Sequence, residues 1–496
     1  MKSQKPGLHE IFDNNASKMG SELAVREGGK DWSYGELLTR SESLSDYLVS
    51  LGIVQGHLVA LMLPNSGVFV MALFSILRAG AIIVPLNTRY QEQELKYYID
   101  DISPSAIVVS PDDVSRVKVI LAGIKYPPIL IEMSIDGNFR MLQGGEERDV
   151  EKSGCTDSPV LLQFTSGSTG EPKRVLRTHG QLIFELERLS RVFELGEGER
   201  YLGAAPFSHV NGLVRTMLLS MFAKGTLYPL PSFNRREVLR IISQERITYF
   251  GAVPYMYITL TVTPLRGAVD LSSIRTAFSS SAPLLPEDNR AFEGKFGFFV
   301  RQLYGSTETG TISVNMDQDI EESLESVGQP LDGVRVEIID DEGTILPHGQ
   351  LGEVGIASPA AITAYENNPT ANAQSFKEGF YLSGDLGFKD DEGRLTLTGR
   401  KKFLINRGGY EVNPFETEKA IMGYKKVEEV VVFGVPTRHG DHSIKSLIVV
   451  NAPCTEKEII EHCRSMIADY KVPGTIDFVK SLPKSQTGKI LRNKCS

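Results

Sequence analysis

Apolar residues recur along the chain alternately at helical and at strand spacing. Ser33 and Glu36 form a Ser-x-x-Glu pattern, typical of a helix start, and apolar positions at helical spacing follow as far as Leu51. Because strands and helices alternate, we expect an α/β fold with parallel sheets and helices on their faces. The periodicity predicts helices over 68–78 and 236–245 and short strands over 57–63, 81–85, 106–110, 128–133, 247–253 and 274–279.

The pattern changes from Val327 onward. Residues 334–340 and 394–398 alternate like antiparallel strands, and each run adjoins an Asp-Asp-Glu-Gly turn. The segment Gly399-Arg-Lys-Lys402 is polar and begins with glycine between apolar strands, so we expect a domain boundary and a hinge there. A compact α+β domain is predicted beyond it, with helices over 414–422 and 456–468 and strands over 427–435, 446–451 and 475–479.

Length and composition narrow the class of protein. With 496 residues, 41% of them hydrophobic, the chain has enough apolar material for several folding units, and its 4 cysteines are too few for a disulfide-stapled scaffold. The 53 basic and 62 acidic residues give a net charge of −9, which argues against nucleic-acid binding through a generally basic surface. The most apolar stretch, 68–77, is shorter than the roughly 18 residues of a membrane span, and the N-terminus lacks a signal-peptide core. We therefore expect a cytoplasmic protein without a membrane span.

The strongest local motif is Thr165-Ser-Gly-Ser-Thr-Gly-Glu-Pro-Lys173, which follows an apolar strand. Its glycines let backbone N–H groups point inward as an anion-binding nest, and its hydroxyls add donors. Lys173 supplies the positive charge that a polyphosphate needs. The spacing differs from the ordinary P-loop, in which lysine directly follows the second glycine. The alternative is a surface loop rich in serine and glycine.

This motif resembles the phosphate-binding segment of the AMP-forming (adenylate-forming) ligases, a superfamily of acyl- and aryl-CoA synthetases, adenylation domains and beetle luciferases. The chain is identified as a member of the acyl-/aryl-CoA synthetase type, because the resemblance extends from Trp32 to Lys489. Further segments resemble family motifs in the family's order: Pro206-Phe-Ser-His-Val-Asn-Gly212, Ser279-Ser-Ser-Ala-Pro-Leu284, Tyr304-Gly-Ser-Thr-Glu308, Tyr381-Leu-Ser-Gly-Asp385, Gly399-Arg400 and Pro483-Lys-Ser-Gln-Thr-Gly-Lys489.

The resemblance also implies the domain organisation. An N-terminal domain, residues 1–399, is expected to bind ATP and the acid and to combine sheets and helices with a distorted β-barrel-like part. A small mobile α+β cap domain, residues 400–496, is expected to swing about a hinge near Lys402. Gly408 and Gly409 resemble the loop that lines the tunnel for the pantetheine arm of coenzyme A.

Three residues are implied to be catalytic. Lys489 resembles the lysine that neutralises developing charge in the adenylation transition state. His209 resembles the residue that closes over the carboxylate or moves between the half-reactions, and Glu308 is expected to hold Mg²⁺ directly or through water. The implied ATP/AMP site consists of Thr165, Ser166, Gly167, Ser168, Thr169, Gly170, Lys173, Ser280, Ser281, Ala282, Tyr304, Gly305, Thr307, Asp385 and Arg400.

The expected acyl pocket is apolar and aromatic with some hydroxyl character, which fits an aryl or acyl monocarboxylic acid. Residues 206–214 contain no acidic side chain, which disfavours an α-amino acid. Arg215 either receives the second carboxylate of a dicarboxylic acid or forms a structural ion pair. The pocket residues are Val210, Tyr255, Ala277, Phe278, Ser279 and Gly310.

The expected reaction joins a carboxylic acid to AMP with release of pyrophosphate and then passes the acyl group to a thiol. Fixed positive charge and hydrogen-bond donors suit this chemistry, because both reactants are anions. Coenzyme A is the expected acceptor, and a free-standing acyl carrier protein is the alternative. A non-catalytic relative with a binding or regulatory role is a further alternative. We expect a monomer or a homodimer.

Overall fold

The structure is a computed structural model that describes residues 6–145, 158–166, 172–265, 267, 269–407, 410–436, 442–484 and 490–495. The chain forms two compact units. Unit 1 comprises Met1–Leu324, Leu331–Val334 and Ala357–Phe376, and unit 2 comprises Glu325–Pro330, Arg335–Ile356 and Lys377–Ser496. The expected boundary between residues 399 and 400 stays a prediction.

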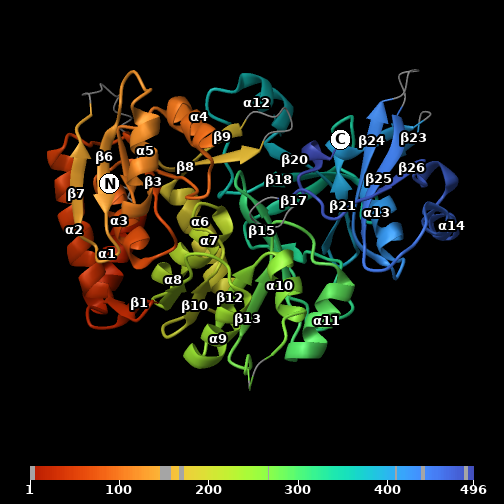
Figure 1. The fold of residues 1–496 in the computed structure, drawn as a ribbon, viewed down its shortest axis with the longest axis horizontal. Coiled ribbons are helices and arrows are strands. Elements are labelled where there is room, and N and C mark those ends of the chain that lie inside the picture. Colours follow the sequence, from red (N-terminus) through yellow and green to blue (C-terminus); the bar gives the residue numbers. More distant parts are fainter. Residues whose placement is uncertain are drawn as a thin grey trace. The chain divides into compact units, whose positions relative to one another are not determined.

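One sheet of unit 1 has seven strands in the order β7-β6-β5-β3-β4-β8-β9. Its inner strands are parallel, and the outermost pairs, β6 with β7 and β8 with β9, are antiparallel. Helices α4 and α5 cover one face through a shared apolar core (Figure 1). The bounds are β3 (Leu58–Met62), β4 (Ile82–Pro85), α4 (Glu92–Ile102), β5 (Ala106–Val109), α5 (Val114–Leu121), β6 (Ile129–Met133), β7 (Phe139–Gln143), β8 (Pro159–Ser166) and β9 (Pro172–Thr178).

The second sheet of unit 1 runs in the order β15-β14-β13-β12-β10-β11-β1-β2. Helices α9, α10 and α11 cover one face of this sheet through a second apolar core. The bounds are β1 (Leu23–Glu27), β2 (Lys30–Ser33), β10 (Arg200–Gly203), β11 (Thr226–Pro229), α9 (Arg235–Glu245), β12 (Tyr249–Ala252), α10 (Pro254–Thr261), β13 (Thr276–Ser279), α11 (Pro286–Phe296), β14 (Arg301–Ser306) and β15 (Gly310–Val314).

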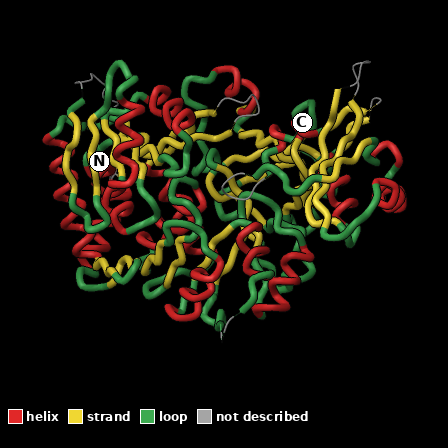
Figure 2. Tube along the Cα trace, in the orientation of Figure 1, coloured by secondary structure: helices red, strands yellow, loops and turns green. Residues whose placement is uncertain are grey.

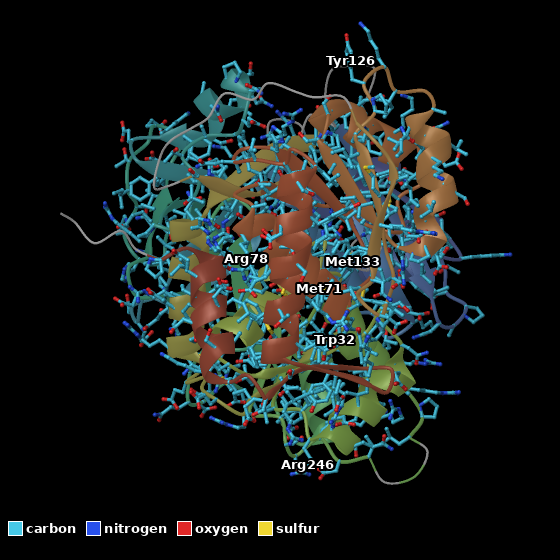
Figure 3. The ribbon with its side chains drawn as sticks, turned by 90° about the vertical axis from the view of Figure 1, so that its left-hand side faces the viewer. Trp32, Met71, Arg78, Tyr126, Met133 and Arg246 are labelled. Atoms are coloured by element: carbon cyan, nitrogen blue, oxygen red, sulfur yellow. The ribbon has the colours of Figure 1, made fainter. Side chains whose placement is uncertain are left out.

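Two further helices of unit 1, α3 and α6, contact strands of both sheets. Helix α3 contacts β3 and β4 of one sheet and β1 of the other, and α6 contacts β9 and β15. Trp32, labelled in Figure 3, is fully buried, and its ring leaves no room for a Cβ at Gly67, where α3 begins. The bounds are α1 (Leu8–Lys18), α2 (Tyr34–Ser50), α3 (Gly67–Arg78), α6 (His179–Val192), α7 (Val210–Gly212), a π-helical turn (Leu213–Leu218), α8 (Leu219–Phe222) and α12 (Pro369–Ser375).

Unit 2 contains a five-stranded sheet in which β17, β18, β20 and β19 follow one another and β21 pairs with β20. A three-stranded sheet, β24-β25-β26, packs with α13 and α14 around its own apolar core. The bounds are β16 (Gln329–Pro330), β17 (Arg335–Ile339), β18 (Gly352–Ala357), β19 (Phe376–Lys377), β20 (Phe380–Lys389), β21 (Leu395–Arg400), β22 (Ile405–Arg407), β23 (Tyr410–Val412), α13 (Pro414–Met422), β24 (Val427–Pro436), β25 (His442–Val450), α14 (Glu456–Met466) and β26 (Thr475–Phe478).

The predicted α/β class is confirmed, and helices and strands alternate through both units (Figure 2). The predicted antiparallel pair around the second Asp-Asp-Glu-Gly turn is β20 with β21. The π-helical turn at Leu213–Leu218 was not expected, since its apolar positions also fit an α-helix. No helix in the described parts of the chain combines the length and the apolarity that crossing a bilayer demands.

Candidate active site

Ser280, Ser281 and Ala282, which the resemblance places at the adenine of ATP, follow β13 directly. Ser279 and Ser280 are almost fully buried, and their Oγ atoms have no hydrogen-bond partner among the described residues. The next residue, Ser281, has a φ of 74°, a left-handed conformation that is strained for a residue with a Cβ. Backbone strain and unsatisfied buried hydroxyls both concentrate at ligand-binding positions. Ala282 follows this turn, and Tyr304 is a buried residue of β14.

Glu308 lies in the turn between β14 and β15 and is buried. The hydroxyl of Thr165, near the end of β8, donates to Oε1 of Glu308 at 3.2 Å. The hydroxyl of Tyr365 donates to the same oxygen at 3.0 Å. Oε2 is the oxygen that neither donor occupies. An oriented carboxylate of this kind suits Mg²⁺, which takes one or two carboxylates and completes its shell with phosphate oxygens and water.

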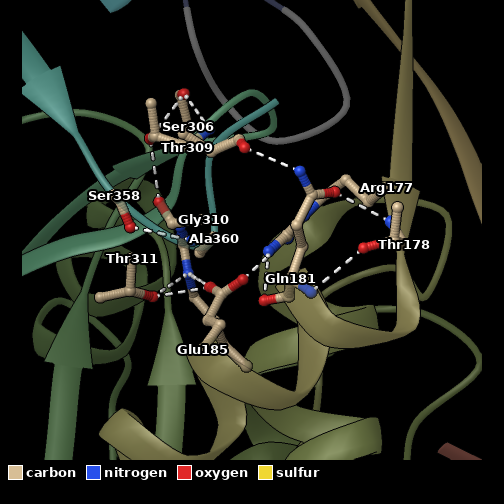
Figure 4. A network of polar contacts seen from close by, with 12 residues as sticks. Arg177, Thr178, Gln181, Glu185, Ser306, Thr309, Gly310, Thr311, Ser358 and Ala360 are labelled. Atoms are coloured by element: carbon tan, nitrogen blue, oxygen red, sulfur yellow. Dashed lines mark hydrogen bonds and ion pairs between the residues drawn. The ribbon is translucent and has the colours of Figure 1, made fainter. Parts of the chain in front are cut away.

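The turn itself is stabilised from within. Thr309 donates its backbone N–H to Oγ of Ser306 at 3.2 Å, and the hydroxyls of these two residues lie 3.0 Å apart (Figure 4). Thr307 is placed between them, next to Glu308. The turn therefore contains a threonine of the implied ATP/AMP site directly before the carboxylate expected to hold Mg²⁺.

Lys173 lies on β9, the antiparallel partner of β8. Thr165 and Lys173 are cross-strand partners, so the hydroxyl and the ammonium belong to the same end of this hairpin. The Nζ atom of Lys173 lies 4.5 Å from the centroid of the Tyr365 ring. Tyr365 therefore contacts both Lys173 and Glu308, two residues that were predicted for different parts of Mg-ATP. Gly167, Ser168, Thr169, Gly170 and the side chain of Ser166 lie outside the described residues.

A fully buried ionic network lies behind this turn. Arg177 of β9 donates to Oε2 of Glu185 on α6 at 2.7 Å, and Thr311 of β15 donates to Oε1 at 2.8 Å (Figure 4). Arg215, on the π-helical turn, lies 3.4 Å from the same Oε1 through Nε. Burial acts to raise the pKa of Glu185, but the charges of Arg177 and Arg215 outweigh it and hold that pKa below its usual value. The network joins four elements around one carboxylate.

Two glycines of the β14–β15 pair are required by this network. A Cβ at Gly310, whose φ is +68°, would fall 2.6 Å from Oε2 of Glu185. A Cβ at Gly305 would fall 2.4 Å from Nη2 of Arg215. Larger residues at either position would collide with a charged group that cannot move into solvent. The backbone that carries Tyr304 and Glu308 is therefore held directly against the network.

Arg215 was predicted either to receive a second carboxylate or to form a structural ion pair. Its side chain is 1% exposed and pairs with Glu185, and its Nε donates to Oγ1 of Thr311 at 3.0 Å. Desolvation lowers the pKa of this guanidinium. These contacts favour the ion-pair alternative.

His209 caps α7 with its backbone. Its N–H donates to the carbonyl of Pro206 at 3.1 Å, and its carbonyl accepts from the N–H of Leu213 at 2.8 Å. The residue is exposed, yet the surrounding protein desolvates the imidazole and lowers its pKa below the ordinary value of 6.5. The imidazole is therefore neutral at pH 7, and it can donate or accept a hydrogen bond without adding charge.

The predicted acyl-pocket residues differ in exposure. Ala277 and Ser279 are buried on β13, and Val210 is half-buried at the start of α7. Tyr255, on the first turn of α10, is 43% exposed and packs edge-on against Phe233. The exposed ring of Tyr255 is available to contact an apolar ligand. The buried residues would instead determine the shape of the pocket wall.

The side chain of Phe278 is fully buried in the core and does not line a pocket. Its ring stacks on Phe193 with centroids 5.8 Å apart and meets Tyr249 edge-on at 5.6 Å. The ring also occupies the space that a Cβ at Gly251 would need. The side chain of Phe278 therefore belongs to an aromatic cluster in the core, and its contribution to a pocket is to support the backbone of β13.

Unit 2 carries two residues of the implied ATP/AMP site: Asp385, expected at the ribose, and Arg400, expected at the ribose or the phosphate. Asp385 on β20 is buried and is the cross-strand partner of Arg400 on β21. Arg400 donates Nε–H to Oδ1 of Asp385 at 2.6 Å, and the backbone N–H of Asp385 donates to Oγ of Ser383 at 3.1 Å. The structure thus brings together two residues that are predicted from separate motifs.

Lys402, the predicted hinge, lies in a short 3₁₀ turn, Lys401–Phe403, between β21 and β22. The neighbouring Lys401 is paired with Glu353 at 3.0 Å. Gly408, Gly409 and Lys489 lie outside the described residues. The chain on either side of the Lys489 segment is paired, because Lys484 and Ile490 form an antiparallel bridge.

The sequence prediction missed Tyr365, Arg177 and Glu185. Glu185 had a usable signal that was overlooked: it lies on α6 at the spacing of the buried positions Leu182 and Leu189, which puts its carboxylate on the face of the helix that packs into the core. Tyr365 had none, because it belongs to an irregular segment before α12. Its partner Glu308 is 57 residues away in the sequence.

Comparison with known proteins agrees with this arrangement. The family model for AMP-binding enzymes matches residues 12–366, and the model for the AMP-binding enzyme C-terminal domain matches residues 416–489. The long-chain-fatty-acid–CoA ligase of Bacillus subtilis is 30% identical over 98% of this chain and 93% of that protein. The feruloyl-CoA synthase of an Amycolatopsis species is 31% identical over 95% of this chain and 94% of that protein.

Among solved structures, ATP-bound MatB from Rhodopseudomonas palustris superposes with a TM-score of 0.88 at 27% identity, over 99% of this chain and 98% of that chain. A family model covers most of unit 1, and a second covers most of the α+β part of unit 2. The chain therefore belongs to the AMP-binding enzyme family.

Proposed function

We propose that the protein is an AMP-forming acid–CoA ligase that uses Mg-ATP. It activates a carboxylic acid as an acyl adenylate, releases pyrophosphate and then transfers the acyl group to coenzyme A. Both the family membership and the relatives, which are CoA ligases by name, support this reaction.

The observation that carries the proposal is the position of Glu308. The carboxylate is buried, and Thr165 and Tyr365 both donate to its Oε1. The described residues contain no cluster of three or more His, Cys, Asp or Glu side chains that holds a metal by itself. Glu308 together with nucleotide phosphates is the donor set that Mg²⁺ prefers. The bound ion would supply charge neutralisation at the phosphates.

In this proposal, different charged residues bind different parts of the nucleotide. Lys173 holds the β- and γ-phosphates, Arg400 and Asp385 hold the ribose, and Lys489 neutralises charge that develops as the carboxylate attacks the α-phosphate. Fixed charges of this kind stabilise the transition state because they need no reorganisation during the reaction. His209 is neutral at pH 7, so its proposed role is to orient the acid and close over it rather than to add charge.

We propose an aryl or acyl monocarboxylic acid as the substrate. Tyr255 offers an exposed aromatic face, and Ala277 and Ser279 are small. Arg215 has Glu185 and Thr311 as partners and no exposed surface to offer to a second carboxylate. The names of two relatives support this choice, because a long-chain fatty acid is an acyl monocarboxylic acid and the feruloyl group derives from an aryl monocarboxylic acid.

Coenzyme A is the proposed acceptor, with Gly408 and Gly409 at the pantetheine tunnel. A carrier protein presents the same thiol and stays the alternative. We also propose that the protein is a cytoplasmic monomer or homodimer, and that its cap domain, residues 400–496, swings about a hinge near Lys402 between the two half-reactions. Light scattering of the purified protein distinguishes the two oligomeric states.

The test is to incubate the protein with ATP, Mg²⁺ and a panel of carboxylic acids and to identify the products. AMP and pyrophosphate are expected, and ADP would contradict the proposal. Lys173→Met should abolish the release, whereas Lys125→Met, at an exposed lysine of the same unit, should not. Mass spectrometry after addition of coenzyme A or of a carrier protein then identifies the acid and the acceptor.

A further inference from the structure

Tyr365 contacts two side chains that the proposed function assigns to different parts of Mg-ATP. Its hydroxyl donates to Oε1 of Glu308 at 3.0 Å, and its ring lies 4.5 Å below Nζ of Lys173. The residue is 3% exposed, so the surrounding protein restricts its movement. A single rigid side chain thus spans the distance between the carboxylate and the ammonium.

The backbone of Tyr365 is clamped from both sides by one asparagine. The N–H of Tyr365 donates to Oδ1 of Asn372 at 2.7 Å, and Nδ2 of Asn372 donates to the carbonyl of Tyr365 at 3.0 Å. Asn372 belongs to α12, which begins only a few residues after Tyr365. The ring of Phe376 packs edge-on against Tyr365 at 5.6 Å. These contacts set the direction of the phenol before any ligand arrives.

The segment around Tyr365 is also joined to the turn that carries Glu308 and to β9, the strand that carries Lys173. The N–H of Ile362 donates to the carbonyl of Glu308 at 2.8 Å. The N–H of Glu366 donates to the carbonyl of Arg174, the residue after Lys173, at 3.1 Å, and the side chains of Arg174 and Glu366 form an ion pair at 3.0 Å. The segment therefore keeps Lys173 and Glu308 at a constant separation.

We propose that Tyr365 is a positioning residue for adenylation: its hydroxyl aims Glu308 at Mg²⁺, and its ring holds the Lys173 ammonium beside the triphosphate. This inference rests on the proposed function. The hydroxyl restricts the rotation of the carboxylate by occupying Oε1, which leaves Oε2 for the ion. The electron-rich face of the ring attracts the ammonium and carries no net charge, so it does not compete with the phosphates as a counter-ion would.

The two contacts are separable by substitution. Tyr365→Phe removes the hydroxyl and keeps the ring, so it should raise the Mg²⁺ concentration for half-maximal pyrophosphate release by about 10- to 100-fold, the usual loss when a partner of a metal ligand is removed. Affinity for ATP in EDTA, measured by calorimetry, should stay at the wild-type value. Tyr365→Leu removes the ring as well and should weaken ATP binding in EDTA too.

Tyr34→Phe is the matched control, because it also removes a buried hydroxyl that donates one hydrogen bond, to the carbonyl of Gly225 at 2.8 Å. Its Mg²⁺ dependence should equal that of the wild type. Thr165→Val removes the other donor to Oε1 and should shift the Mg²⁺ dependence in the same direction as Tyr365→Phe.

An unchanged Mg²⁺ dependence in Tyr365→Phe would overturn the inference. Equal weakening of ATP binding with and without Mg²⁺ in that variant would also overturn it, because the hydroxyl would then act on the fold rather than on the ion. These outcomes are distinct from failure of the proposed function, in which the wild-type protein itself releases no AMP from any acid.

Discussion

Arg400 donates its Nε–H to Oδ1 of Asp385 at 2.6 Å across an antiparallel pair in which the two residues are direct partners. The carboxylate is nearly buried, whereas the guanidinium is 38% exposed. Only the Arg400 side of this ion pair is open to solvent, because the Asp385 carboxylate is nearly buried. This geometry suits a polar ligand such as a ribose, whose two hydroxyls can donate to the carboxylate while Arg400 keeps it oriented.

Asp385→Asn should therefore weaken ATP binding. The amide accepts hydrogen bonds less strongly than the carboxylate, and a hydrogen bond to a charged group contributes about 1.5–3 kcal/mol, so we expect the KM for ATP to rise by about 10- to 100-fold. Asp341→Asn is the control, since Asp341 is a highly exposed carboxylate of the same unit that pairs with Lys401 on the surface. Equal KM values for the two variants would contradict the assignment of Asp385.

Lys489→Ala should separate the two half-reactions. Lys489 is proposed to neutralise charge only during adenylation, so adenylate formation should be abolished while thioester formation from pre-made acyl adenylate stays largely intact. Lys484→Ala is the control within the same segment, because Lys484 pairs with Glu429 at 2.5 Å on the protein surface. A similar loss of activity in both half-reactions for Lys489→Ala would contradict the role proposed for Lys489.

The elements that sequence predicts accurately are those determined by local contacts. Ser33 Oγ accepts from the N–H of Glu36 at 3.1 Å, as the Ser-x-x-Glu pattern indicated. Helix α13 begins and ends where predicted, because Asn413 caps it and Pro414 occupies its first turn. The motifs placed Asp385 and Arg400 in one nucleotide site, and the structure adds that the two residues are cross-strand partners.

The parts that sequence did not predict depend on contacts between distant segments. Tyr365 meets Glu308 and Lys173 only after β8, β9, β14 and the segment before α12 have assembled, and no local pattern distinguishes it from a core tyrosine. Arg215 was ambiguous for the same reason. Its role depends on Glu185, which lies on another helix and is paired with a second arginine.

Glu185→Gln should destabilise unit 1 strongly. The substitution leaves Arg177 and Arg215 buried without a counter-charge, and removal of one partner from a buried ion pair costs about 3–5 kcal/mol. We expect a clearly lower melting temperature by circular dichroism. Glu132→Gln is the control, because Glu132 pairs with an arginine that is 70% exposed, and such pairs contribute about 0–1 kcal/mol. Similar melting temperatures for the two variants would show that the network contributes little.

The last prediction concerns the pH dependence of stability and rests on Asp288, in the first turn of α11. Burial, with a smaller contribution from the neighbouring Glu287, raises the pKa of Asp288 from 3.8 to about 6. The folded state therefore binds a proton more tightly than the unfolded state does. Stability from this group is fully present below pH 3.8 and declines as the pH rises to about 6, because the unfolded chain ionises first.

Asp288→Asn removes this titration, so the melting temperature of the variant minus that of the wild type should become more positive between pH 4 and pH 7. Differential scanning calorimetry at several pH values measures the difference directly. Glu287→Gln leaves Asp288 in place but removes the charge that helps to raise its pKa, so it should move the decline to lower pH without abolishing it. A difference that stays constant from pH 4 to pH 7 would mean that Asp288 ionises in the folded protein as easily as in the unfolded chain.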